Sequence, residues 1–238
     1  MNKVIRYGIL IMCFGFVATT VSVSEARAQG GPLGEILRRM DLNNKSLQSM
    51  QADLTMVKYE SALKVSDTLI GSTSYLPKSP KHVMYIRVDW KTENGKPKEE
   101  SMSVIGDDYE LYKPTINQVI AGKVQKAKGS PSVGNALGFM TMSKDQLKAN
   151  YDVVYLGEEQ INGGTKTLHL QLTPKSQTSY KSAELWVDGD GMPRQAKVIV
   201  RNDDSTTVFL SNIQKNLTLR ADIFKLNYDK KKVKIIKA

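Results

Sequence analysis

The sequence is poor in the residues that make catalytic and metal sites, with one cysteine, Cys13, and two histidines, His82 and His169, in 238 residues. Cys13 lies in an N-terminal apolar run that is typical of an export signal, so the exported chain would keep no cysteine. That excludes disulfides, thiol catalysis and cysteine metal sites. Neither histidine has His-x-x-x-His or similar ligand spacing. We expect no metal site, and we expect both histidines to lie on solvated strands.

Motifs for catalysis are also missing. The sequence has no Gly-x-Ser-x-Gly elbow, no Walker loop and no dinucleotide fingerprint. The run Asp188-Gly-Asp-Gly191 resembles the start of a calcium loop, but Ile199 stands at the twelfth position, where an acid is needed, so a hairpin turn is favoured. Adjacent acids such as Glu99 and Glu100 point to opposite faces of a strand. We therefore expect a protein that is not an enzyme and needs no cofactor.

The N-terminal segment predicts export. Lys3 and Arg6 precede an apolar core at residues 9–23, and Ala26-Arg27-Ala28 is a small-x-small cleavage site. We expect residues 1–28 to be a cleaved signal peptide and residues 29–238 to form a single periplasmic domain, soluble after cleavage and monomeric. No other stretch approaches the roughly 18 apolar residues of a membrane span.

Basic residues outnumber acidic ones, giving a formal charge of +10. Removal of residues 1–28 takes away three basic groups and one acid, which leaves +8. Most basic residues alternate with acids, which argues against nucleic acid as a partner. The exception is a lysine-rich end: Lys225, Lys230, Lys231, Lys232, Lys234 and Lys237. These lysines suit anionic lipid headgroups or an acidic protein patch, or they protect a solvated edge strand from aggregation.

Hydrophobic spacing predicts a mainly β (α+β) fold. Leu33, Ile36, Leu37 and Met40, continued by Leu47 and Met50, recur at helical spacing after Pro32. A second helical interval covers 131–150, with a capping box from Ser143 to Gln146. Alternating stretches predict strands at 53–59, 68–76, 82–91, 99–105, 109–113, 116–121, 151–157, 166–173, 182–187, 194–201, 206–213, 224–228 and 233–236.

Eleven or so short strands without strand–helix–strand alternation predict one large curved antiparallel sheet, or an incomplete β-barrel, covered by lid helices. The residues expected to face its concave side are Leu37, Met40, Leu54, Met56, Met84, Ile86, Val88, Trp90, Met102, Val104, Phe139, Met140, Leu168, Leu170, Leu172, Leu185, Val198 and Val200. An ordinary core accounts for them. A wide sheet with few covering helices also allows an apolar ligand cavity, to which flexible methionines are suited.

The order of three short segments carries a resemblance. These are 47–54 (LQSMQADL), 182–194 (SAELWVDGDGMPR), and 212–216 (NIQKN) followed by 224–226 (FKL). In this order, and spanning nearly the whole exported chain, they resemble the outer-membrane lipoprotein carrier family of LolA-like periplasmic chaperones.

The resemblance implies an incomplete barrel whose lid opens over a cavity for the acyl chains of lipoproteins. It implies an inner-membrane lipoprotein-releasing transporter as donor, an outer-membrane protein as acceptor and acylated lipoproteins as cargo. Family members hold the lid through an arginine, for which Arg38, Arg39 and Arg87 are candidates here. The alternative is a periplasmic lipid-binding or envelope-sensing interaction module of the same fold.

Overall fold

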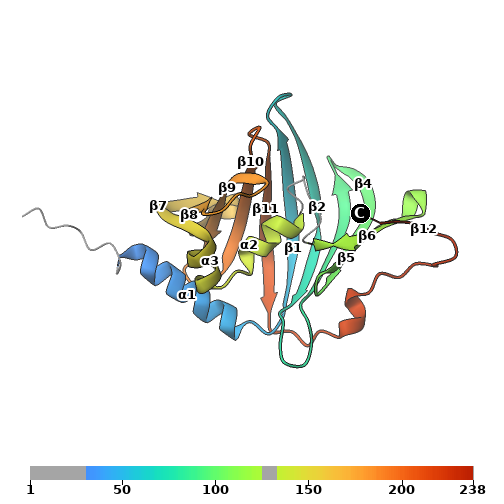
Figure 1. Ribbon diagram of the computed structural model, residues 1–238, viewed down its shortest axis with the longest axis horizontal. Helices are drawn as coiled ribbons and strands as arrows, with labels where there is room; N and C mark the ends of the chain where they lie inside the picture. The colour runs from blue at the N-terminus through green and yellow to red at the C-terminus, as the bar shows by residue number, and fades with distance from the viewer. Residues whose placement is uncertain (1–30, 125–132, 238) are drawn as a thin grey trace, which may run out of the picture.

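The computed structural model describes residues 31–124 and 133–237, so the predicted signal peptide lies outside the described residues (Figure 1). Three α-helices and twelve strands occupy the described ranges. The helices are α1 (Pro32–Ser46), α2 (Val133–Met140) and α3 (Lys144–Asn150). The strands are β1 (Met50–Glu60), β2 (Val65–Leu76), β3 (Tyr85–Glu93), β4 (Lys96–Ile105), β5 (Asp108–Lys113), β6 (Gln118–Lys123), β7 (Tyr151–Ile161), β8 (Thr165–Pro174), β9 (Tyr180–Val187), β10 (Pro193–Val200), β11 (Ser205–Lys215) and β12 (Lys234–Lys237).

All twelve strands form one open sheet in the order β12-β6-β5-β4-β3-β2-β1-β11-β10-β9-β8-β7. β1 lies near the middle, between β2 and β11, and antiparallel neighbours account for every pairing except that of β12 with β6, which is parallel. The three α-helices lie on one side of the sheet (Figure 1). The predicted fold class, a large curved sheet covered by helices, is therefore confirmed.

The strand predicted at 224–228 is wrong. The chain instead forms a 3-10 turn, η4 (Ala221–Phe224), followed by a segment outside the sheet. Side chains of the sheet bind the backbone of this segment: Arg87 Nη1 donates to the carbonyls of Ile223 and Lys225 at 2.8 and 3.0 Å. Ser103 Oγ donates to the carbonyl of Phe224 at 2.5 Å. These bonds take the place of a strand ladder. We call residues 221–227, which lie against β3 and β4, the strap.

Other boundaries also differ from the prediction, and two of them change the reading of a residue. α1 ends at Ser46, and Met50 already belongs to β1, so its helical spacing from Leu47 is coincidental. β3 begins at Tyr85, because His82 is held in a separate bridge with Ser79. The predicted capping box is confirmed: Ser143 and Gln146 exchange side-chain and backbone hydrogen bonds at the start of α3.

α1 docks against the turn between β9 and β10 through a close backbone approach. Gly191 has φ +82°, and a Cβ there would lie 2.3 Å from the carbonyl carbon of Arg39. Asp188 Oδ1 accepts the backbone N–H of Met192 at 2.9 Å, which fixes the turn. The run that resembles a calcium loop is thus a hairpin turn, as predicted, and Gly191 is needed both for its φ and for the space.

α1 presents its apolar side to the sheet, with Ile36, Leu37 and Met40 buried, while the Glu35 side chain is 43% exposed. Hydrogen bonds from Arg38 and Arg39 lower the pKa of Glu35 to about 2. Within the described ranges, no helix is both long enough and apolar enough to cross a membrane.

Candidate binding site between the sheet and the covering helices

The structure brings most of the predicted site residues into one core between the helices and the sheet. Fourteen of the eighteen are buried there: Leu37, Met40, Leu54, Met56, Ile86, Val88, Trp90, Val104, Phe139, Met140, Leu170, Leu172, Leu185 and Val198. Met84, Met102 and Leu168 are partly buried and pack against the same core. Val200 is half-buried and lies outside this cluster, because β10 has a register irregularity between Ile199 and Val200.

Between α2 and the sheet lies a small apolar cavity. It is lined by Leu47, Met50, Thr73, Tyr75, Ile86, Leu137, Met140, Thr141, Met192 and Leu210, and its volume is about 20 Å³. That is room for about one water molecule, whereas pockets that bind small molecules hold roughly 300–1,000 Å³. The apolar side chains of α2 thus fill the space under it, and we call α2 the lid.

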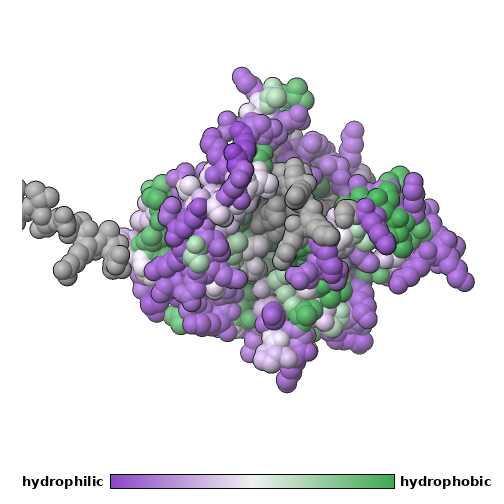
Figure 2. All heavy atoms as spheres, viewed as in Figure 1, coloured by the Kyte–Doolittle hydropathy of each residue, from purple (hydrophilic) through white to green (hydrophobic). Residues whose placement is uncertain are grey.

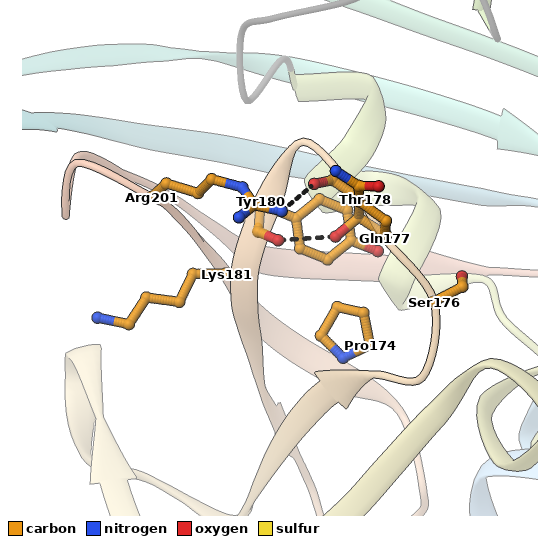
Figure 3. Close-up of a pocket in the computed structure, with 7 residues that line it drawn as sticks. All are labelled: Pro174, Ser176, Gln177, Thr178, Tyr180, Lys181 and Arg201. Atoms are coloured by element: carbon orange, nitrogen blue, oxygen red, sulfur yellow. Dashed lines mark hydrogen bonds between the residues drawn. The ribbon is translucent and has the colours of Figure 1, made fainter.

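A larger recess lies at one end of β8 to β10, but its lining is polar. It has a volume of about 410 Å³ and includes Pro174, Gln177, Lys181 and Arg201. Figure 3 shows Arg201 reaching the carbonyl of Thr178, at 3.3 Å. Because this lining carries charged and hydroxyl groups, the recess suits an apolar chain less well than the apolar interior of the sheet does.

An aromatic contact fastens the lid at Phe139. Its ring meets the rings of Tyr151 and Tyr180 edge-on, with centroid separations of 5.6 and 5.7 Å. The two tyrosine hydroxyls are joined by a 2.5 Å hydrogen bond. Burial, assisted by that bond, raises the pKa of Tyr180. Phe139 therefore sits against a fixed pair of rings, which suits a tight but separable contact.

A hydrogen bond from α1 fastens the same, C-terminal end of the lid. Asn44 Nδ2 donates to the carbonyl of Thr141, just after α2, at 3.1 Å. Beneath it, burial raises the pKa of Tyr75 to about 12. Leu137 and Met140 contribute apolar contact to the cavity wall. The lid is thus held by apolar side chains together with few polar contacts.

The three candidate lid arginines have other partners. Arg38 and Arg39 bind Glu35, and Arg39 also donates to the carbonyl of Gly189 at 3.1 Å. Arg87 pairs with Asp89 at 2.7 Å and binds the strap. Among the contacts of the described residues, none joins these arginines to α2, so the expected arginine–lid bond is not formed by them; Asn44 makes the contact from α1.

His169 differs from its predicted solvated position. It stacks on Trp186, with ring centroids 4.2 Å apart, and its side chain is only 16% exposed. Nδ1 lies 3.0 Å from a carboxylate oxygen of Glu159, which also accepts the Trp186 indole N–H at 2.8 Å. A wide tryptophan on the neighbouring strand β9 covers the imidazole, which alternation along β8 could not reveal. His82 is half-buried, with Nδ1 3.0 Å from the carbonyl of Val83.

Several residues of the site were not predicted from the sequence. Met192 lies in a turn, where exposure is expected, yet its backbone bond to Asp188 directs it inward to the cavity. Asn44 is a polar residue within a helical segment, and nothing in its sequence neighbourhood signals a lid contact. Tyr75 is the last residue but one of a predicted strand, and its alternation with Thr73 could have marked it as inward-facing.

A protein-family model matches most of this architecture. A model described as "Outer membrane lipoprotein carrier protein LolA" matches residues 87–227, which is more than half of the chain. The chain belongs to the LolA family. The matched segment runs from β3 to the strap and therefore includes the lid and α3. A search of curated proteins found no match.

Several solved structures are similar to this chain at low sequence identity. An uncharacterized conserved protein from Thermus thermophilus aligns with a TM-score of 0.52 and 15% identity, covering 87% of this chain and all of that one. A domain assigned to outer membrane lipoprotein sorting, from Vibrio parahaemolyticus, has a TM-score of 0.45 and 15% identity, covering 80% and 94% of the two chains. The lipoprotein LppX of Mycobacterium tuberculosis gives 0.42 and 13%, covering 79% and 99%.

Proposed function

We propose that this LolA-family protein is an exported, periplasmic, non-enzymatic carrier that binds the acyl chains of lipoproteins between the lid and the sheet. In this proposal it receives an acylated lipoprotein from an inner-membrane releasing transporter and delivers it toward the outer membrane. The observation that carries the proposal is the lid itself, which lies over the apolar interior of the sheet and leaves only about 20 Å³ unfilled.

The physical need for such a carrier follows from acyl-chain burial. Each buried CH₂ is worth about 0.8 kcal/mol, so a chain of lipid length cannot cross water unescorted. The sheet offers the required surface: Leu54, Val88, Leu170 and Leu210 are fully buried in one continuous core. An acyl chain that takes the place of the lid side chains would retain that apolar contact.

Binding in this account requires the lid to move, because the closed space is far too small for an acyl chain. The contacts broken are those of Leu137, Phe139 and Met140, together with the Asn44 bond to Thr141. The acyl chain replaces apolar contacts by apolar contacts, so exchange is close to balanced. A carrier that must both accept and release cargo without a nucleotide needs this balance.

The test is a comparison of two methionine variants in an acyl-binding titration. Met140 lines the cavity, whereas Met142, two residues later, packs against the core without lining it. Met140→Gln keeps the side-chain length and helix propensity but places an amide in the cavity wall. An amide without a partner destabilises the closed lid by about 1–3 kcal/mol and reaches solvent when the lid opens, so affinity for a fluorescent fatty acid or triacylated peptide should rise about tenfold.

Met142→Gln serves as the matched control and should retain near-normal affinity. Thermal unfolding of both variants should be measured to check that each still folds. Equal affinities of the two variants and the parent protein, or no acyl binding by the parent at micromolar ligand, would contradict the proposed function.

A further inference from the structure

The edge strand β12 carries apolar side chains that folding does not explain. All four of its residues, Lys234 to Lys237, are exposed, so the strand contributes no side chain to the core. Ile235 is 50% exposed and Ile236 is 36% exposed. The strand is attached through its parallel pairing with β6. Both isoleucines thus leave a large share of their apolar surface in water, which a contact outside the fold would cover.

A third isoleucine lies beside the strand. Ile116 is 61% exposed at the end of the 3-10 turn η1 (Pro114–Ile116). The backbone N–H of Lys234 donates to the carbonyl of Asn117, the next residue, at 2.8 Å, which holds the turn against β12. Figure 2 shows hydrophobic side chains gathered at the side of the molecule where Figure 1 places β12.

In the described part of the chain, lysines without ion pairs precede Ile235 and Ile236. Lys230, Lys231 and Lys234 are exposed, and the ion pairs found across residues 31–124 and 133–237 include none of them. Lys232, by contrast, lies 3.8 Å from Asp229. We call Ile116, Ile235, Ile236, Lys230, Lys231 and Lys234 the β12 patch. As neighbours on a strand, Ile235 and Ile236 point to opposite faces, so the patch is the open edge of the sheet and not one of its faces.

Protection against aggregation explains only half of this composition. Lysines on an edge strand discourage pairing with other chains, but exposed isoleucines on the same edge promote it. Lysines together with protruding apolar side chains are the combination that binds the interface of an anionic bilayer. The apolar groups enter the boundary between headgroups and acyl chains, and each lysine is attracted by the negative surface.

We propose that the β12 patch docks this protein on the surface of an anionic lipid bilayer. β12 lies at one end of the sheet order and β7 at the other, while the lid contacts β10 and β11. Docking through the patch therefore leaves the lid and α1 away from the contact. A bilayer is favoured over an acidic protein because isoleucines protrude beside the lysines at an open edge of the sheet. The adjoining recess of about 420 Å³, which Lys230 lines, is also walled by Asp108 and Glu110, so an acidic segment entering it would meet like charges.

Sedimentation with vesicles tests the proposal directly. The exported chain should bind vesicles that contain phosphatidylglycerol and bind vesicles of phosphatidylcholine alone much more weakly, with the difference lost at high salt. The triple variant Lys230→Gln, Lys231→Gln, Lys234→Gln should lower the partition coefficient about a hundredfold. Ile235→Ser with Ile236→Ser should lower it roughly tenfold, because less apolar surface is buried.

A matched control removes the same charge elsewhere. Lys58, Lys148 and Lys166 are exposed and lie on β1, α3 and β8, away from β12. Changing these three to glutamine should reduce binding far less than the β12 triple change. Equal loss from both triples, equal binding to both kinds of vesicle, or binding of an acidic protein without binding of vesicles would overturn the proposal. The vesicles contain no lipoprotein, so the result does not depend on the carrier function.

Discussion

Asn44→Ala isolates the hydrogen bond that ties the lid to α1. Asn44 Nδ2 donates to the backbone carbonyl of Thr141 at 3.1 Å. A hydrogen bond of this kind contributes about 1 kcal/mol net, so its loss should raise the population of the open lid about fivefold. The same change improves helix propensity by up to about 0.7 kcal/mol, which nearly offsets the loss in global stability. The lid is thus loosened while the fold is preserved.

Loss of the bond between Asn44 and Thr141 should make the protein bind an acyl chain more tightly. If only the open form accepts an acyl chain, the apparent dissociation constant falls in proportion to the rise in the open population. Stopped-flow fluorescence with an environment-sensitive fatty acid should show an apparent affinity about fivefold higher and correspondingly faster binding. Asn44→Asp should behave similarly, because a carboxylate cannot donate the bond.

Lys45→Ala provides the control for this prediction. Lys45 is the next residue of α1 and pairs with Asp41 at 2.7 Å, in an exposed contact that contributes little to stability. It should leave acyl affinity unchanged. Affinity that is unchanged or lower in both Asn44 variants would refute the reasoning, since it would show that the lid does not limit access.

Three further predictions concern stability, measured by urea denaturation. Gly191→Ala should destabilise the protein by well over 2 kcal/mol, because the added Cβ meets the backbone of α1, whereas Gly95→Ala, with φ +76° and open space around it, should lose only about 1 kcal/mol. Burial raises the pKa of Asp89, but hydrogen bonds from Arg87 and Ser101 lower it overall. The ionised Asp89 therefore contributes its full share to the free energy of unfolding above about pH 4, and this share is lost as pH falls through the lower folded pKa. Asp89→Asn should destabilise the protein at pH 7 and much less at pH 3. Phe224→Ala, in the fully buried strap residue, should remove about 3–5 kcal/mol.

The sheet could be predicted from the sequence because its signal is local. Alternation of apolar and polar residues specifies a strand wherever one face is buried, and the turn residues Asn94 and Gly95 mark a hairpin. The capping box at Ser143 likewise depends on a pattern of only four residues, Ser143 to Gln146. These features depend on neighbours in the chain, so one sequence suffices to find them.

The strap and the closed lid could not be predicted in the same way. The strap takes its form from Arg87 and Ser103, which lie more than a hundred positions earlier in the chain. Whether apolar residues enclose a cavity or fill it depends on how Leu137 and Met140 fit the sheet, which is a matter of volume and not of pattern. The sequence identified most of the core residues, but it could not show that the side chains of the lid fill the space between the lid and the sheet.

The most direct test of the central claim is native mass spectrometry of the exported chain purified from membrane-containing cells, with solvent extraction to identify any ligand. The account predicts one acylated peptide or phospholipid bound per chain, released on extraction. A mass equal to that of the bare chain, together with no uptake of a fluorescent fatty acid at micromolar concentration, would contradict it. The apolar residues between the lid and the sheet would then be a permanent core.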